Sequence, residues 1–264
     1  MNESILRSAL AGLPVAQIHY FAETGSTNDQ ARMLLEQGAP DGTLVVSNAQ
    51  TQGRGRLGRT WVTTPGAALA FSLALRPSMP EQNHLAFFSP LAGLAVCQAL
   101  QLEYRVAAEV KWPNDVLINR RKVCGVLVEA SWLGSRLQGV VLGIGINVGL
   151  AAVPPDDQVL FPAACVEQAL GRPLERVELL AAVLRQVFSL RSALGSAAFH
   201  TMWQEHLAFR GEEVRVDWLG PGETVDGQVL GIDPNGNLRL RLQTGSEISV
   251  AAGDVRLRPL RTGL

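Results

Sequence analysis

Three strand-like segments follow one another between residues 109 and 148, and they constrain the fold more than any other part of the chain. Only short turns at 119–121 and 133–135 separate the segments, which cover residues 109–118, 122–129 and 137–148. Such short connections suit antiparallel neighbours, because parallel strands need a long crossover between them. The segments therefore predict an antiparallel meander and an α+β fold, not a series of βαβ units.

Glycines interrupt the second and third of these segments. Glycine weakens a strand, and it is useful there mainly where a ligand or another backbone must come close. Gly125, Gly143 and Gly145 are therefore candidates for the floor of a binding pocket.

A loop rich in glycine and arginine follows an apolar strand at residues 43–47. It contains Gly53-Arg54-Gly55-Arg56-Leu57-Gly58-Arg59 and ends at Trp61. Glycines allow the backbone to approach a ligand, and guanidinium groups match the oxygens of phosphates and carboxylates. The order of residues fits neither a Walker loop nor a dinucleotide-binding fingerprint. The loop by itself predicts an anion site, with phosphate as the favoured anion.

The remaining segments predict further strands and helices of the larger unit, followed by a second, smaller unit at the C-terminus. Strands are expected at 18–21 and 67–75, with Ser26 or Thr27 as the N-cap of a helix over 29–36. Further helices are expected at 80–102, where Pro90 should kink or split the helix, and at 163–170, 174–194 and 200–208. Short alternating strands at 214–218, 224–232, 238–242 and 247–250 indicate a small SH3-like barrel. The predicted boundary divides the chain into residues 1–208 and 209–264.

Composition excludes several classes of protein. The net charge of −1 argues against a chain built mainly to hold nucleic acid. The three cysteines, at 97, 124 and 165, lack the spacing of a disulfide framework or a zinc site. No signal peptide and no run of about 18 apolar residues is found, which predicts a cytoplasmic protein. Of the 23 basic residues only Lys111 and Lys122 are lysines, which hints that an ammonium is needed there.

Taken together, the motifs resemble those of the biotin protein ligase family, over roughly residues 18–260. Six occur in the family's order: Ser26-Thr27-Asn28, Gln50 with the loop 53–61, Lys111-Trp112-Pro113-Asn114-Asp115, residues 122–129, residues 143–147, and the terminal barrel. The resemblance implies a class II synthetase-like catalytic domain, with a mixed or antiparallel sheet flanked by helices. Few residues precede the first strand, so the monofunctional form without a DNA-binding domain is expected.

The resemblance also implies the reaction and its participants. Such enzymes join biotin to ATP as biotinyl-5′-AMP, with Mg²⁺, and transfer the biotinyl group to a lysine of a biotin carboxyl carrier protein. Fixed cations on a mobile loop suit a step that brings a carboxylate to a polyphosphate. No DNA or membrane partner is expected. The sequence leaves a homodimer and the metal ligands open.

Residue roles follow from the same resemblance. Lys111, Arg54 and Arg56 are the expected catalytic residues. The expected biotin site consists of Ser26, Thr27, Asn28, Gln50, Gly53, Arg54, Trp61, Lys111, Gly125, Gly143 and Gly145. The expected nucleotide site consists of Arg56, Arg59, Trp61, Asn114, Asp115 and Asn147. Trp112 suits the core as well as a ligand contact, and Glu129 suits a structural partner of an arginine.

Three other functions compete with this interpretation. A lipoate or octanoate ligase shares the fold, but the arginine loop and the terminal barrel argue against it. A nucleic-acid-binding module would need a basic surface and more stacking aromatics than the 6% present. A non-catalytic biotin-binding protein would not need Lys111.

Overall fold

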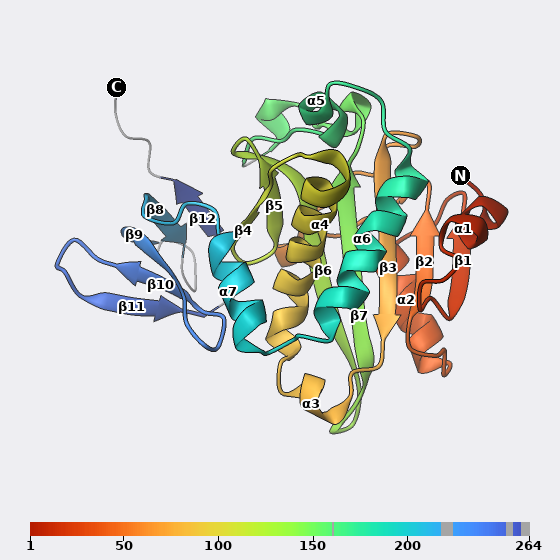
Figure 1. Ribbon diagram of the computed structural model, residues 1–264, viewed down its shortest axis with the longest axis horizontal. Helices are drawn as coiled ribbons and strands as arrows, with labels where there is room; N and C mark the ends of the chain where they lie inside the picture. The colour runs from red at the N-terminus through yellow and green to blue at the C-terminus, as the bar shows by residue number, and fades with distance from the viewer. Residues whose placement is uncertain (160, 218–223, 252–255, 260–264) are drawn as a thin grey trace.

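The computed structural model describes residues 1–159, 161–217, 224–251 and 256–259, and it contains two sheets (Figure 1). The larger sheet has seven strands in the order β1-β2-β3-β7-β6-β5-β4. β1 and β2 are parallel, and the other neighbouring pairs are antiparallel. The strands are β1 Gln17–Phe21, β2 Thr43–Ser47, β3 Ala68–Leu75, β4 Glu109–Lys111, β5 Asp115–Ile118, β6 Arg121–Leu133 and β7 Arg136–Asn147. This mixed, mostly antiparallel sheet confirms the predicted fold class.

The predicted meander is present, but it has four strands, β4 to β7, and not three. The first predicted segment, residues 109–118, is divided by a turn into β4 and β5, which pair antiparallel. Asn119 and Arg120, between β5 and β6, both have positive φ, at 48° and 63°. Two consecutive left-handed residues give a tight turn whose twist matches that of a hairpin. β7 lies between β3 and β6 in the middle of the sheet, and its last nine residues are buried. The predicted glycines of β6 and β7 therefore lie near the centre of the sheet.

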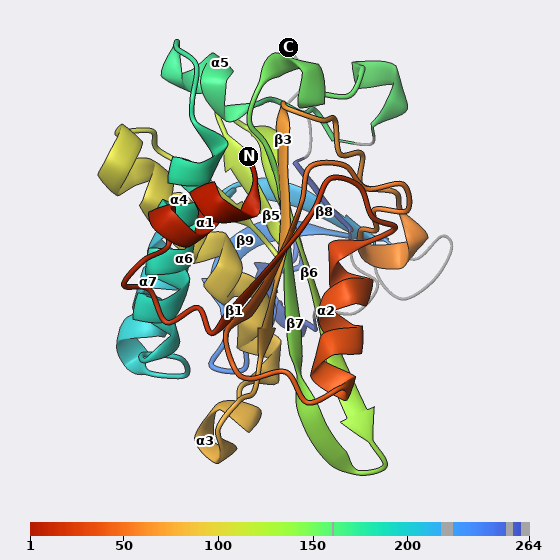
Figure 2. The same cartoon turned by 90° about the vertical axis from the view of Figure 1, so that its right-hand side faces the viewer.

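Helices cover both faces of the larger sheet. α4 (Phe88–Tyr104) and α6 (Arg176–Arg191) pack together on one face, with α1 (Glu3–Ala9) beside them. α2 (Thr27–Glu36) packs against β2, β3 and β7 on the opposite face (Figure 2). The shorter helical segments are α3 Met79–Gln82, α5 Val166–Leu170, α7 Ala197–Glu205, η1 Arg56–Gly58, η2 Leu85–Phe87, η3 Leu150–Ala152 and η4 Asp156–Gln158. The sheet is thus flanked by helices, as predicted.

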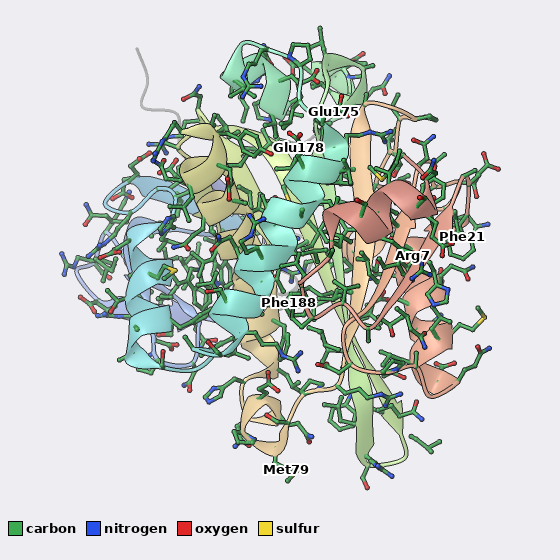
Figure 3. The ribbon with its side chains drawn as sticks, turned by 45° about the vertical axis from the view of Figure 1, so that its right-hand side comes forward. Arg7, Phe21, Met79, Glu175, Glu178 and Phe188 are labelled. Atoms are coloured by element: carbon green, nitrogen blue, oxygen red, sulfur yellow. The ribbon has the colours of Figure 1, made fainter. Side chains whose placement is uncertain are left out.

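Helix α6, within the predicted helix 174–194, has a buried side and an exposed side. Leu180 and Val183 are fully buried, whereas Glu175 and Glu178 at the N-terminal end are exposed (Figure 3). A carboxylate near a helix N-terminus interacts favourably with the helix dipole. The buried stripe of α6 contributes to a core that also contains Cys97 and Cys124. All three cysteines, Cys165 included, are free and buried.

The prediction for residues 80–102 needs a correction at Pro90. The segment is split, but the break lies between α3 and α4, and Pro90 occupies the first turn of α4. The missing N–H of proline costs little there, because the first turn has no intrahelical acceptors for its N–H groups. Pro90 therefore helps to begin the helix and does not interrupt it.

One helical stretch in the described part of the chain, Leu85–Tyr104, is long and apolar enough to cross a membrane. Within this fold 67% of the stretch is buried, and α4 packs against α6 and the large sheet. The length and apolar composition of this stretch are therefore those of a helix in the protein core.

The second sheet has five antiparallel strands in the order β11-β10-β9-β8-β12. Its strands are β8 Glu213–Asp217, β9 Thr224–Ile232, β10 Leu238–Arg241, β11 Glu247–Val250 and β12 Arg256–Pro259. Four of them match predicted segments, although Trp218 lies outside the described residues. β12 was not located by the sequence patterns. The small antiparallel sheet agrees with the predicted C-terminal unit.

Hydrogen bonds from Trp112, His200 and Gln204 join the C-terminal unit to the larger unit. The indole Nε1 of Trp112 donates to the carbonyl oxygen of Gly236 at 3.0 Å. Gln204 in α7 makes two hydrogen bonds to the backbone of Ile232, one in each direction. Trp112 is 1% exposed, which supports its interpretation as a core residue. Since Trp112 follows Lys111 directly, the C-terminal sheet supports the segment that carries this lysine.

Candidate active site

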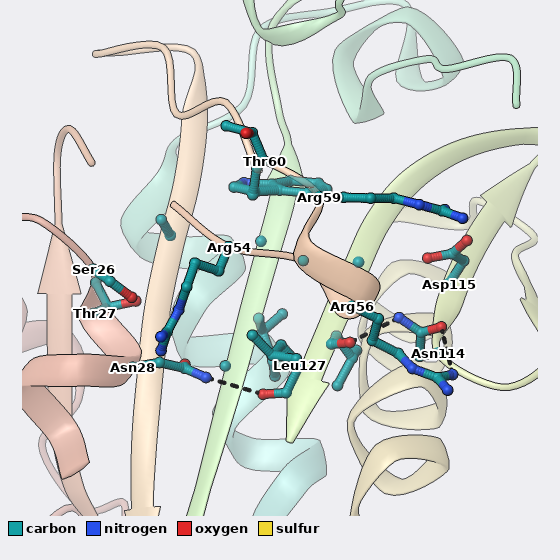
Figure 4. Close-up of a pocket in the computed structure, with 18 of the residues that line it drawn as sticks. Ser26, Thr27, Asn28, Arg54, Arg56, Arg59, Thr60, Asn114, Asp115 and Leu127 are labelled. Carbon is teal, nitrogen blue, oxygen red and sulfur yellow. Dashed lines mark hydrogen bonds between the residues drawn. The ribbon is translucent and has the colours of Figure 1, made fainter. Parts of the chain in front are cut away.

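A hollow lies on the α2 side of the large sheet, beneath the arginine loop (Figure 4). It extends from the N-terminus of α2 across β7 and β6 to the turn between β4 and β5. The structure brings together in it most of the predicted site residues: Ser26, Thr27, Asn28, Gln50, Arg54, Arg56, Arg59, Trp61, Lys111, Asn114, Asp115, Gly125, Gly143 and Gly145. Segments more than 100 residues apart in the chain therefore line one cavity.

Thr27 and Gln50 form the polar end of this hollow. The backbone N–H and the hydroxyl of Thr27 both donate to Oε1 of Gln50, at 2.8 and 3.0 Å. The amide Nε2 of Gln50 donates to the hydroxyl of Thr63 at 2.9 Å. Ser26 occupies the N-cap position of α2, as predicted, but its side chain makes no capping hydrogen bond. The hydroxyl of Ser26 therefore lines the hollow without capping the helix.

Asn28 is the centre of a buried hydrogen-bond network beside this end. Its Oδ1 accepts from the hydroxyl of Ser72 at 2.7 Å, and its Nδ2 donates to a carboxylate oxygen of Glu129 at 2.6 Å. Arg54 reaches the same carboxylate at 3.2 Å and the carboxylate of Asp29 at 2.8 Å. Figure 4 shows Arg54 turned toward Asn28. Glu129 is thus the partner of an arginine, as its sequence context suggested.

The glycines of β6 and β7 allow side chains to lie directly on the sheet. A Cβ atom on Gly145 would come within 2.4 Å of the Trp61 indole, and one on Gly125 within 3.1 Å. A Cβ atom on Gly143 would come within 2.0 Å of Oδ1 of Asn28. The predicted pocket floor is therefore a place where only glycine fits without displacement of a neighbour. The buried Nε1 of Trp61 has no hydrogen-bond partner among the described residues.

Two lysines and one aspartate form a buried cluster at the other end of the hollow. Nζ of Lys111 lies 3.2 Å from one carboxylate oxygen of Asp115, and Nζ of Lys122 lies 2.6 Å from the other. Burial opposes ionisation of this carboxyl group, but the charges of Lys122 and Lys111 outweigh it and hold the pKa of Asp115 well below its usual range. Two ammonium groups and one carboxylate give the cluster a formal net charge of +1, so it would attract an anion.

Asn114 joins the arginine loop to this cluster. Its Nδ2 donates to the carbonyl oxygen of Val126 at 2.8 Å, and its Oδ1 accepts from Arg56 at 3.4 Å. Arg59 extends toward Asp115 (Figure 4). The loop therefore places Arg56 and Arg59 at the lysine end of the hollow, whereas Arg54 lies at the α2 end.

A second hollow adjoins the first and shares with it Arg59, Thr60, Trp61, Lys111, Asp115 and Lys122. Asn147, Val159 and Phe161 belong to the second hollow alone. Nδ2 of Asn147 donates to the carbonyl oxygen of Ala164 at 3.1 Å, so this side chain is held in place. Nζ of Lys111 lies 4.9 Å from the centroid of the Phe161 ring. The lysine cluster therefore stands at the junction of two cavities.

Two predicted site residues lie outside the first hollow. Asn147 lines the second hollow, and Gly53 lines a groove that extends toward the C-terminal sheet. A Cβ atom on Gly53 would come within 2.3 Å of the Trp61 carbonyl oxygen. Gly53 is therefore required for close packing of the loop backbone.

Several residues at or beside the site are not among the predicted catalytic, biotin-binding and nucleotide-binding residues. Lys122 is the most important. Two signals point to it in the sequence: it is one of only two lysines, and it begins the motif of residues 122–129. Ser72 and Thr63 contribute buried hydroxyls, and Phe161 contributes an aromatic wall. Ser72 sits within the apolar strand β3, where no local pattern distinguishes it from its neighbours.

Comparison with known proteins identifies the family. A sequence model of the Biotin/lipoate A/B protein ligase family matches residues 20–147, and one of the Biotin protein ligase C terminal domain matches residues 210–258. A biotin–[acetyl-CoA-carboxylase] ligase of Paracoccus denitrificans is 36% identical over 240 residues, which cover 88% of this chain and 97% of that protein. The chain belongs to the biotin protein ligase family.

Two further similarities agree with this membership. A biotin–[acetyl-CoA-carboxylase] ligase of Mycobacterium tuberculosis is 34% identical, over 97% of this chain and 95% of its own. The biotin protein ligase of Aquifex aeolicus in complex with biotin and ATP has a TM-score of 0.79 and 30% identity, over 92% of this chain and 99% of that one. The chain is thus an enzyme of the biotin protein ligase type, an ATP-dependent ligase that activates and transfers biotin.

Proposed function

We propose that the two adjoining hollows hold biotin and ATP side by side and that Lys111 acts at their junction. The biotin carboxylate attacks the α-phosphorus of ATP, which gives biotinyl-5′-AMP and pyrophosphate. The amine of a carrier lysine then attacks the acyl carbon, which gives an amide and AMP. The observation that carries this proposal is the position of Lys111, which lines both hollows and pairs with Asp115.

The first hollow suits biotin, whose head is a neutral ureido group on an apolar bicycle. Such a ligand needs a few fixed hydrogen bonds within an apolar wall. Ser26, Thr27 and Gln50 would serve the ureido end, since they supply hydroxyl and amide groups held by neighbouring hydrogen bonds. Trp61 and the glycine-lined strands would form the wall. The biotin carboxylate would then point toward the lysine cluster.

The second hollow suits the nucleotide. Arg56, Arg59, Lys111 and Lys122 are cations at or beside the junction, where the carboxylate must approach the polyphosphate. Fixed cations lower the energy of such a step because charge develops on the phosphate oxygens within their reach. Phe161 and Asn147 would line the space for the base. Lys122 thereby joins the set of expected catalytic residues.

Among the described residues, those that line the two hollows do not form a magnesium site of their own. Asp115 is the one carboxylate that lines either hollow in the described part of the chain, and both of its oxygens face lysine ammonium groups. The described residues contain no cluster of three acidic, histidine or cysteine side chains that could hold a metal. Mg²⁺ commonly binds through substrate phosphates and water. Mg²⁺ therefore stays a prediction from the family resemblance.

The acceptor is proposed from the names of the relatives, which are biotin–[acetyl-CoA-carboxylase] ligases. The acceptor would be a lysine on a biotin carboxyl carrier protein. We also propose a cytoplasmic location, which fits a carrier of that kind, and a division into a catalytic unit, residues 1–208, and a C-terminal unit, residues 209–264.

Exchange of labelled pyrophosphate into ATP tests the first half-reaction. We expect exchange that depends on biotin and that lipoate does not support. Exchange with lipoate and none with biotin would favour the competing lipoate ligase and would refute the proposal.

A further inference from the structure

The chain contains only two lysines, and both meet the same buried carboxylate. Lys111 on β4 and Lys122 on β6 approach Asp115 on β5 from its two neighbouring strands. The side chains of Lys111 and Asp115 are 7% and 10% exposed, and that of Lys122 is 26% exposed. This arrangement places every side-chain amine of the protein within the proposed active site.

That position creates a chemical problem, if the proposed function holds. Biotinyl-5′-AMP is a mixed anhydride, and a neutral amine attacks it readily. Attack by a lysine of the enzyme would form an amide bond between its nitrogen and the biotinyl acyl carbon. The bond between the acyl carbon and the phosphate oxygen would break, AMP would leave with the electron pair of that bond, and the nitrogen would release a proton to solvent. The enzyme would thus acylate and inactivate itself.

We propose that Asp115 is a positioning residue that prevents this self-acylation. Its two oxygens hold Lys111 and Lys122 as ammonium ions, which have no lone pair with which to attack the acyl carbon. The cations still attract the carboxylate and phosphate oxygens of the substrates. The amine supplied by the carrier protein is then the nucleophile that reacts.

The charges around the cluster make Asp115 necessary for this purpose. Arg56 and Arg59, from the loop above, line the same hollow and add further positive charge beside the two lysines. Burial raises the pKa of the adjacent Cys124 thiol, so this group stays neutral and offers no compensating charge. Asp115 is the single carboxylate that lines the two hollows among the described residues. Its low pKa keeps it ionised throughout the neutral range.

Two aromatic rings also interact favourably with the charged forms of Lys111 and Lys122. Nζ of Lys111 lies over the ring of Phe161, and Nζ of Lys122 lies 5.6 Å from the Trp61 ring centroid. Ring faces attract cations and not neutral amines. These contacts alone are weaker than a buried ion pair, so removal of the carboxylate should expose the reactivity of both lysines.

The scarcity of lysine makes self-labelling easy to detect. The full-length protein is supplied with chemically prepared biotinyl-5′-AMP over a range of pH, and acylation is mapped by intact mass and by peptide mass spectrometry. Asp115→Asn removes the charge and keeps the shape. Asp226→Asn, which removes an exposed ion pair with Arg215 in the C-terminal sheet, is the matched control. Asp115→Asn combined with Lys111→Arg or Lys122→Arg shows which amine reacts.

We expect the Asp115→Asn protein to gain biotinyl groups at Lys111 or Lys122 at least about tenfold faster than the wild type at neutral pH, with a pH profile displaced to lower pH. The Asp226→Asn protein should behave as the wild type. A folded Asp115→Asn protein that is no more labelled than the wild type, or whose pH profile is unchanged, would overturn the proposal.

The wild type alone provides a test if the variant does not fold. A small neutral acylating reagent should modify Lys122 at least about tenfold more slowly than the amine of free lysine. Reaction of Lys122 at the rate of free lysine would overturn the proposal. Because these tests use a supplied acyl donor, they do not require the adenylation step. Failure of biotin-dependent pyrophosphate exchange in the wild type would instead refute the proposed function.

Discussion

Replacement of Gly143 by alanine offers a quantitative test of the pocket floor. Gly143 lies on β7, and the new Cβ atom would lie 2.0 Å from Oδ1 of Asn28. Ordinary contact begins at 3.4 Å, so the amide must retreat by about 1.4 Å. Asn28 is 4% exposed and lies in a hydrogen-bonded network, so this retreat cannot occur without loss of contacts.

The magnitude follows from the bonds that the displacement breaks. The bond from Ser72 to Asn28 is 2.7 Å long and that from Asn28 to Glu129 is 2.6 Å long, and neither survives an extension of more than an ångström. A buried neutral hydrogen bond contributes about 1 kcal/mol and one to a carboxylate about 1.5–3 kcal/mol. Glu129 is partly exposed, and water replaces part of its loss. We therefore expect the free energy of unfolding to fall by about 2–3 kcal/mol.

Urea denaturation followed by intrinsic fluorescence measures this change. Gly25→Ala is the matched control, because its Cβ atom would lie at an ordinary 3.7 Å from Oε1 of Gln52. The control should lose less than about 1 kcal/mol. Calorimetric titration should also show weaker biotin binding by the Gly143→Ala protein. Equal stability and equal biotin affinity in the two variants would refute the account of the floor.

Three further predictions concern other parts of the molecule. Lys111→Ala should lower the rate of biotin adenylation about 100- to 1000-fold while biotin binding is partly retained, which pyrophosphate exchange and calorimetry distinguish; an unchanged rate would contradict the role of this lysine. Trp112→Phe should lower the free energy of unfolding by about 1–3 kcal/mol, because the carbonyl of Gly236 loses its donor; denaturation at wild-type stability would contradict the structural link. Since the pKa of Asp115 is lower in the folded than in the unfolded chain, the unfolded state binds more protons in acid, so stability should fall below about pH 4. That dependence should be weaker in Asp115→Asn, and an identical acid titration of both proteins would contradict the ion-paired cluster.

Much of the fold could be predicted because its signals are local. The meander of β4 to β7 is encoded in short turns and in runs of apolar residues, and the structure confirms it. The sequence does not reveal the role of Pro90, because the effect of a proline depends on where the helix begins. A proline in the first turn is tolerated, and one further along is not. That starting point is set by the packing of α4 in the core.

The candidate site was predicted less completely, because it is assembled from distant segments. Gln50 and Thr27 were expected in one site, and the structure joins them by hydrogen bonds. The pairing of Lys122 with Asp115 depends on the register of β5 against β6, which a bulge alters after Val116. Ser72 meets Asn28 across 44 residues of sequence. No pattern within a single segment contains such contacts.

Transfer of biotin to a carboxyl-carrier domain is the decisive test of the proposed ligase reaction. The wild-type protein is incubated with biotin, ATP and the carrier domain, and the products are identified by mass spectrometry. We expect one biotinyl group on the carrier lysine, formed only when both biotin and ATP are present. The Lys111→Ala substitution should strongly reduce its formation. A protein that binds biotin and ATP but modifies no carrier lysine, or one that transfers lipoate in place of biotin, would contradict the proposed reaction.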